Sequence, residues 1–228
     1  MNTKQIEQEK NEWLDILSAE KIVFGLLGKI LFEFPEKEWI NLLAKDGIFE
    51  EIPFAEEQPN VISGLKLFAG WNDRNKNGVS IEEFEKIKDD YTRLFIGPGE
   101  VQAPPWESLY FQKERIIFQE QTLKVREWYR RYGLESVKLY NEPDDHIGLE
   151  LAFISHLAGL SISALEDNKN STFKELIDAK KVFLSDHILK WANGWIELVT
   201  ENSRSDFYQG TALVIKGALT ELASKYSV

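Results

Sequence analysis

Apolar residues recur at helical spacing along nearly the whole chain of 228 residues. Near the start, Trp13, Leu17, Phe24 and Leu31 fall on one stripe, and similar stripes follow to the end. Spacing of three and four residues indicates an amphipathic helix, whereas a half-buried strand alternates apolar and polar residues. No segment alternates convincingly, and no repeat or low-complexity tract interrupts the pattern. The sequence therefore predicts an all-α helical bundle, with residues 1–228 forming a single domain.

Proline and glycine residues predict where individual helices end. Pro35 should close the first helix, because a proline inside a helix removes a hydrogen-bond donor and clashes with the preceding turn. The Gly-Pro-Gly tripeptide at residues 97–99 should end a helix that carries Phe84 to Phe95. Gly133 is a natural C-cap. The other helices are expected near residues 39–43, 61–68, 116–132 and 147–165, with three more in the tail.

Charge and composition narrow the class of partner and the compartment. The formal net charge of −11 argues against a nucleic-acid partner, because phosphates require a basic surface. A negative charge suits a cationic partner, although many proteins are acidic only because net charge keeps them soluble. There is no cysteine, which removes disulfides, thiolate metal sites and cysteine nucleophiles together. The first ten residues are unlike a secretory signal, and no apolar run approaches the ~18 residues that span a bilayer. We expect a cytoplasmic protein with no transmembrane segment.

One loop resembles a calcium site. Residues 73–84 carry Asp or Asn at positions 1, 3 and 5 of an EF-hand loop, and Gly78 at position 6. The bidentate glutamate required at position 12 is replaced by Phe84. The competing interpretation is a turn leading into a helix capped by Ser80, because Ser80 and Glu83 have the spacing of a capping box. The turn is favoured, and a helical calcium- or metal-binding module is the alternative function.

No segment carries a complete catalytic or cofactor-binding pattern. The glycines at residues 97–99 lack the preceding strand and the Gly-Lys-Ser/Thr of a phosphate loop. His146 and Glu150 are four residues apart and could share a helix face as metal ligands or as an acid–base pair. No second histidine stands at ligand spacing, and the acidic residues around Pro143 are typical of a helix start. Trp106, after two prolines, is either a core anchor or a ligand contact. We expect no enzyme, no cofactor and no metal.

Three segments taken together resemble a known signature. They read YTRLFIGPG at residues 91–99, APPWESLY at residues 103–110 and EPDDH at residues 142–146. Their order and separation resemble those of the TorD/DmsD family of redox-enzyme maturation chaperones, and most of all its DmsD-like branch, associated with dimethyl sulfoxide reductase. The segment FYQ at residues 207–209, expected before the last helix, is also similar to the family.

The resemblance implies a TorD-like bundle and a cytoplasmic chaperone for the twin-arginine signal peptide of a molybdenum-containing reductase subunit, of the dimethyl sulfoxide or trimethylamine N-oxide reductase type. Such a chaperone delays export until the cofactor is inserted and the subunit has folded, and it makes transient contact with the export machinery. Some relatives are reported to bind guanine nucleotide or molybdenum cofactor, which nothing in this sequence supports. Monomer and domain-swapped dimer both stay open. The signal-peptide-binding residues carried over are Tyr91, Leu94, Phe95, Pro105, Trp106, Asp145 and His146.

The resemblance also predicts a geometry. The helix ending at Phe95, the loop at Pro105 and the helix start at Asp145 should converge on one groove. We expect Leu94, Phe95 and Trp106 to offer an apolar surface that supplies most of the affinity for a leader. The acidic residues of the EPDDH segment, Asp145 among them, should meet its arginines as exposed charges that orient the peptide.

Overall fold

The prediction of an all-α fold is confirmed by the computed structural model. It describes residues 3–47, 49, 52–111, 120–135 and 142–228, and every regular element in these ranges is helical. The α-helices are α1 (Thr3–Phe32), α2 (Lys37–Lys45), α3 (Pro59–Asn75), α4 (Ile81–Tyr91), α5 (Ser108–Phe111), α6 (Glu120–Arg131), α7 (Ile147–Glu166), α8 (Asn170–Phe183), α9 (Leu189–Asn202) and α10 (Asp206–Tyr226). Two π-helical turns, η1 (Thr92–Ile96) and η2 (Leu184–Ile188), extend α4 and join α8 to α9.

The helix ends agree with the local signals in most places. The first helix stops at Phe32, just before Pro35. Gly97, with a φ of 96°, ends η1 as expected for a glycine that adopts a left-handed backbone conformation. Ile116 and Ile117, expected on a helix, lie outside the described residues, and α6 is described from Glu120. The expectation that the FYQ segment precedes the last helix is wrong. α10 begins at residue 206, with Ser205 as its N-cap, so residues 207–209 lie in its first turn.

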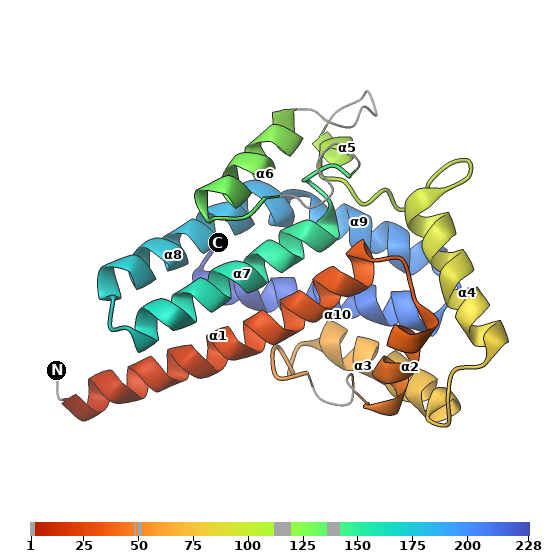
Figure 1. The fold of residues 1–228 in the computed structure, drawn as a ribbon, viewed down its shortest axis with the longest axis horizontal. Coiled ribbons are helices and arrows are strands. Elements are labelled where there is room, and N and C mark those ends of the chain that lie inside the picture. The colour runs from red at the N-terminus through yellow and green to blue at the C-terminus, as the bar shows by residue number, and fades with distance from the viewer. Residues whose placement is uncertain (1–2, 48, 50–51, 112–119, 136–141) are drawn as a thin grey trace.

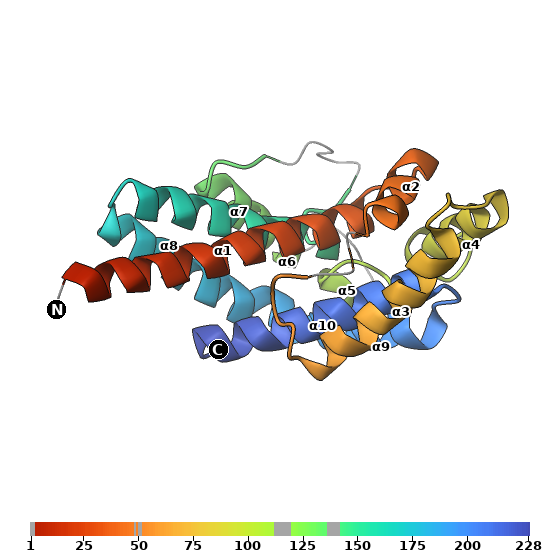
Figure 2. The ribbon, with the colours of Figure 1, turned by 90° about the horizontal axis from the view of Figure 1, so that it is seen from below.

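Two antiparallel helix pairs make up most of the bundle. The longest helix, α1, packs along α7, and α3 packs along α10 (Figures 1 and 2). Glycines let the backbones approach: a Cβ atom built on Gly28 would lie 2.7 Å from the carbonyl oxygen of Gly148. A Cβ atom on Gly64 would lie 2.8 Å from the carbonyl oxygen of Gly210. The small residues are therefore required by the packing of each pair.

One helix is more apolar than the sequence analysis allowed. By length and composition α7 could cross a membrane, contrary to the expectation that no apolar run is long enough. Within the fold, 56% of its apolar window is buried, and α7 packs against both α1 and α8. The central helix of a globular bundle shows the same pattern, so this composition is weak evidence for a membrane span.

Candidate functional site

The three sequence segments meet in space, as predicted, and their forming one groove stays a prediction. The backbone N–H of Ala103 donates to the carbonyl oxygen of Leu94 at 2.9 Å, which ties the 103–110 segment to η1. The N–H of Ile147 donates to the carbonyl of Pro105 at 2.8 Å, and Trp106 forms an antiparallel bridge with His146. Because backbone hydrogen bonds fix the register of extended segments, the start of α7 and the Pro105 loop are joined at one junction.

The end of the α4–η1 helix contributes apolar residues to the core rather than to the surface. The N–H of Gly97 donates to the carbonyl of Thr92 at 2.8 Å, five residues back, which makes the turn π-helical. Leu94 and Phe95 are 0% and 3% exposed, and the Phe95 ring lies 5.9 Å from that of Trp195. The expectation that both form an exposed apolar surface is wrong for this conformation, and their assignment to leader binding stays a prediction.

Tyr91 lies beneath a surface that combines aromatic and acidic side chains. The Tyr91 hydroxyl donates to the carbonyl of Leu31 at 3.0 Å, and its ring packs edge-on against Phe34, which is 48% exposed. Burial raises the pKa of Tyr91 above its ordinary value, and the carboxylates of Glu142 and Glu33 add to the rise. Two carboxylates and an exposed aromatic ring therefore surround this tyrosine.

Pro105 is buried, whereas Trp106 is partly exposed. The Trp106 indole Nε1 donates to Glu142 Oε1 at 2.7 Å, and its ring centroid lies 6.5 Å from that of His146. Trp106 is thus held by its polar atom while part of its ring faces solvent, an arrangement suited to contact with a ligand. Of the seven predicted site residues, it is the one most open to solvent among those that the structure describes.

Asp145 and His146 are structural in this conformation. Asp145 Oδ2 accepts the N–H of Ser108 at 2.8 Å and Oδ1 accepts the hydroxyl of Thr122 at 2.7 Å, with no part of the side chain exposed. His146 is the N-cap of α7, because its Nδ1 accepts the N–H of Gly148 at 3.0 Å. The expectation that Asp145 is an exposed charge is wrong, since both carboxylate oxygens already accept hydrogen bonds.

The other acidic residues of the EPDDH segment differ in the same way. Asp144 is buried and forms a 2.7 Å ion pair with Arg126. Glu142 stays partly exposed and holds the Trp106 indole. The predicted acidic cluster is therefore divided: Glu142 faces solvent, and the two aspartates hold α5 and α6 in place.

A group of buried polar residues lies close to this junction and was not predicted from the sequence. Nδ1 of His187 lies 3.2 and 3.0 Å from the two carboxylate oxygens of Glu107, and Glu150 accepts the indole N–H of Trp191 at 3.2 Å. Burial raises the pKa of Glu150 well above its ordinary value, and the carboxylates of Glu107 and Asp145 add to the rise. Glu107 lies inside a recognised segment, but His187, 80 residues away, carried no local signal.

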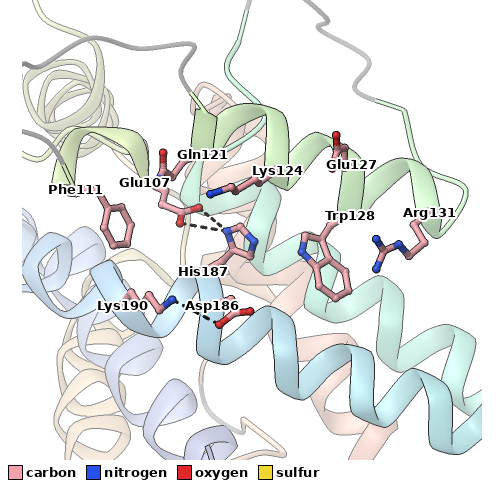
Figure 3. Close-up of a pocket in the computed structure, with 10 residues that line it drawn as sticks. All are labelled: Glu107, Phe111, Gln121, Lys124, Glu127, Trp128, Arg131, Asp186, His187 and Lys190. Carbon is pink, nitrogen blue, oxygen red and sulfur yellow. Dashed lines mark hydrogen bonds and ion pairs between the residues drawn. The ribbon is translucent and has the colours of Figure 1, made fainter.

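His187 also lines a pocket of about 400 Å³ between α6 and η2 (Figure 3). The figure shows the Glu107 carboxylate facing the imidazole, and Lys190 paired with Asp186 at 3.5 Å. The lining residues are Glu107, Phe111, Gln121, Lys124, Glu127, Trp128, Arg131, Asp186, His187 and Lys190. Acidic and basic groups balance among the described residues that line this pocket.

The calcium alternative is not supported. Asp73 and Asn75 lie on α3, and the Asn75 amide is buried and donates to the carbonyl of Trp71 at 2.8 Å. Ser80 caps α4 by accepting the N–H of Glu83 at 3.0 Å, which confirms the turn-and-cap interpretation. In the described ranges, no three histidine, aspartate or glutamate side chains are grouped so that they could hold a metal ion.

Comparison with known proteins gives a consistent result. The family described as "Nitrate reductase delta subunit" matches residues 62–197. The "Probable Tat proofreading chaperone DmsD" of Haemophilus influenzae is 33% identical over 130 residues, which cover 57% of each chain. The "Tat proofreading chaperone DmsD" of Salmonella typhimurium is 27% identical over 137 residues, 60% of each chain. The "Chaperone protein TorD" of Vibrio cholerae is 28% identical over 166 residues, 73% of this chain and 70% of the relative.

These matches span a little under two thirds of the first two relatives, at 57% and 60% of their lengths. The matched family region contains the 91–99, 103–110 and 142–146 segments, and these meet at one junction in the structure. The sequence signature, the all-α fold and the family match therefore agree, and the chain belongs to the TorD/DmsD family.

Proposed function

We propose that this protein is a cytoplasmic chaperone that binds the twin-arginine signal peptide of a molybdenum-containing reductase subunit and delays its export until cofactor insertion and folding are complete. The observation that carries the proposal is the junction of the Trp106 loop with the start of α7, built from two segments of the family signature. Relatives named as Tat proofreading chaperones support the same role. The client is of the dimethyl sulfoxide or trimethylamine N-oxide reductase type.

The charge of the exposed face suits a basic peptide. The chain carries a net charge of −11, and the charges of Glu142 and Glu33 act on Tyr91, against which the exposed ring of Phe34 packs. An exposed ion pair contributes only about 0.2–1 kcal/mol, whereas micromolar affinity requires about 8 kcal/mol. The arginines therefore orient the leader, and apolar contacts supply most of the binding free energy.

The proposal defines the remaining partners and the form of the protein. Residues 1–228 act as one binding domain without catalytic activity, and neither a nucleic acid nor a resident cofactor takes part. Contact with the export machinery is transient. A monomer and a domain-swapped dimer are both compatible with this role.

Calorimetric titration with a twin-arginine leader peptide tests the proposal. The unmodified protein is titrated with the native leader and with an Arg-Arg→Lys-Lys leader, and the Trp106→Ala protein is titrated with the native leader. The matched control is the Trp39→Ala protein, because Trp39 is also a partly buried tryptophan and lies on α2. We expect saturable micromolar binding that Trp106→Ala weakens about tenfold in a protein that stays folded, while Trp39→Ala leaves it unchanged. Absence of saturable binding by the unmodified protein would overturn the proposed function.

A further inference from the structure

An apolar pocket of about 240 Å³ opens beside the junction, between the end of α1, α6 and α7. Its exposed lining is mostly apolar, unlike that of the pocket near His187, which is more polar than apolar. The residues that line it are Phe32, Tyr129, Leu134, Glu135, Leu149, Ala152, Phe153 and His156. None of them belongs to the seven residues predicted from the sequence signature.

Two contacts connect this pocket to the candidate site. The Phe32 ring, in its wall, packs edge-on against the His146 ring with centroids 5.4 Å apart. The hydroxyl of Tyr129, from the opposite side, donates to the carbonyl of Asp144 at 3.0 Å. Since His146 also forms the bridge with Trp106, one aromatic contact links the wall of the pocket to the Trp106 loop.

The apolar contacts expected for a leader have to come from a surface that is accessible. Leu94 and Phe95 are in the core, so neither can contact a peptide without rearrangement of η1. Apolar contact has to supply most of the affinity for a leader, because exposed ion pairs are weak. The pocket offers the apolar opening that this requires, and Glu135, among the described residues that line it, is acidic and complements a basic peptide.

We propose that the pocket walled by Phe32, Leu149 and Phe153 receives an apolar side chain from the hydrophobic stretch of the twin-arginine leader. The inference rests on the proposed function and adds to it the place where the apolar stretch binds. Glu142 and the exposed ring of Phe34 then lie on the side where the basic region of the leader approaches.

The test compares two leucines of the same helix. Leu149 and Leu160 both lie on α7 and are both partly buried, but only Leu149 lines the apolar pocket, while Leu160 lines a separate pocket further along α7. Leu149→Ser should weaken leader binding at least about tenfold, because a Leu-sized contact is lost. Leu160→Ser should change it less than about twofold. A leader whose apolar leucines are replaced by serine should bind weakly, and Leu149→Ser should weaken it little further.

Ala152→Leu provides a second variant that does not remove core contacts. Ala152 is exposed at the pocket wall, so a larger side chain there fills the pocket from within. We expect the same loss of affinity, with the circular dichroism spectrum unchanged. Analytical ultracentrifugation is run beside each titration.

The outcomes separate the two proposals. If the unmodified protein binds no leader, the proposed function fails and the inference fails with it. If the unmodified protein binds but Leu149→Ser and Ala152→Leu bind equally well, only the pocket assignment is overturned. Self-association that both variants abolish would assign the pocket to a second copy of the chain and would also overturn the inference.

Discussion

Glu20 and Lys180 form a buried ion pair, with 2.5 Å between Glu20 Oε2 and Lys180 Nζ, although 160 positions separate them in the chain. The hydroxyl of Tyr226 donates to Glu20 Oε1 at 2.8 Å and accepts from Lys180 Nζ at 3.1 Å. Burial lowers the pKa of Lys180, and the Glu20 carboxylate opposes that shift. The triad joins α1, α8 and α10 by polar contacts inside an apolar core.

Breaking this pair should be costly. Lys180→Met leaves the Glu20 carboxylate buried without its cation, so the free energy of unfolding should fall by about 3–5 kcal/mol. The double variant Glu20→Leu with Lys180→Met should recover part of that loss, since apolar groups replace both charges while the Tyr226 hydroxyl loses these two partners. Urea denaturation of the two variants measures both values. A double variant as unstable as the single one would show that the geometry of the triad, rather than charge pairing, is required.

Gly148 should not tolerate a methyl group. A Cβ atom there would lie 2.8 Å from the carbonyl oxygen of Gly28 and 2.9 Å from the Phe32 backbone. Gly148→Ala should therefore destabilise the protein by about 1–3 kcal/mol through overpacking of α1 on α7. Gly159→Ala, on the same helix, meets only the flexible end of Lys21 at 3.6 Å and should stabilise by about 0.5–1 kcal/mol. Thermal unfolding distinguishes the two, and equal effects would contradict the packing argument.

Asp145→Asn should act on stability more than on charge. The amide nitrogen of asparagine would face a donor where the carboxylate accepts from Ser108 and Thr122, so about 1.5–3 kcal/mol of stability should be lost. Because Asp145 is buried, any effect on leader affinity should be the same at low and high salt. Denaturation and calorimetry at two ionic strengths test both statements, and a strong salt dependence would show that the side chain becomes exposed on binding.

Glu142→Gln should behave in the opposite way. Its carboxylate is partly exposed and can reach a leader while still accepting the Trp106 indole N–H. Screening over about 10 Å at 0.1 M salt should reduce the effect of the variant on affinity as the salt concentration rises. Titrations at about 0.05 and 0.5 M salt test this, and an effect of the same size at both would assign Glu142 to positioning Trp106.

Glu150 should make stability depend on pH. Burial raises the pKa of Glu150 in the folded state above the unfolded value of about 4.3. At a pH between the unfolded-state pKa and the folded-state pKa, folding therefore takes up a proton. The free energy of unfolding should therefore fall as pH rises through that window. Glu150→Gln removes this contribution, so the free energy of unfolding of the variant should fall less than that of the wild type between pH 4 and pH 8. Denaturation across that range checks the difference, and the exposed Glu82→Gln should follow the wild type.

The sequence predicted those features of the fold that depend on interactions between residues close together in the chain. The Ser80 cap was predictable because its hydrogen bond reaches only three residues, to Glu83. The end of the first helix was predictable from Pro35, because a proline limits the helix through its own ring. The all-α fold followed from apolar periodicity, which depends on burial of one helix face and not on the identity of the partner helix.

The parts that failed depend on partners far away in the sequence. The sequence predicts Leu94 and Phe95 at the surface, but both lie on a π-helical turn in the core, where the Phe95 ring packs against Trp195. His187 could not be predicted because its partner, Glu107, is 80 residues away and no spacing relates them. The apolar pocket was not predictable from the sequence either, because its walls come from three helices that are distant along the chain.

The pairing of α3 with α10 has a consequence for synthesis. As the chain leaves the ribosome, the face of α3 around Gly64 emerges long before Gly210, the residue against which it packs. In the same way, α1 is translated long before α7, the helix against which it packs. Native contacts of such large sequence separation slow folding and leave apolar surface open in the meantime. The nascent chain therefore has to keep two apolar helix faces from aggregating until the helices that cover them have been translated.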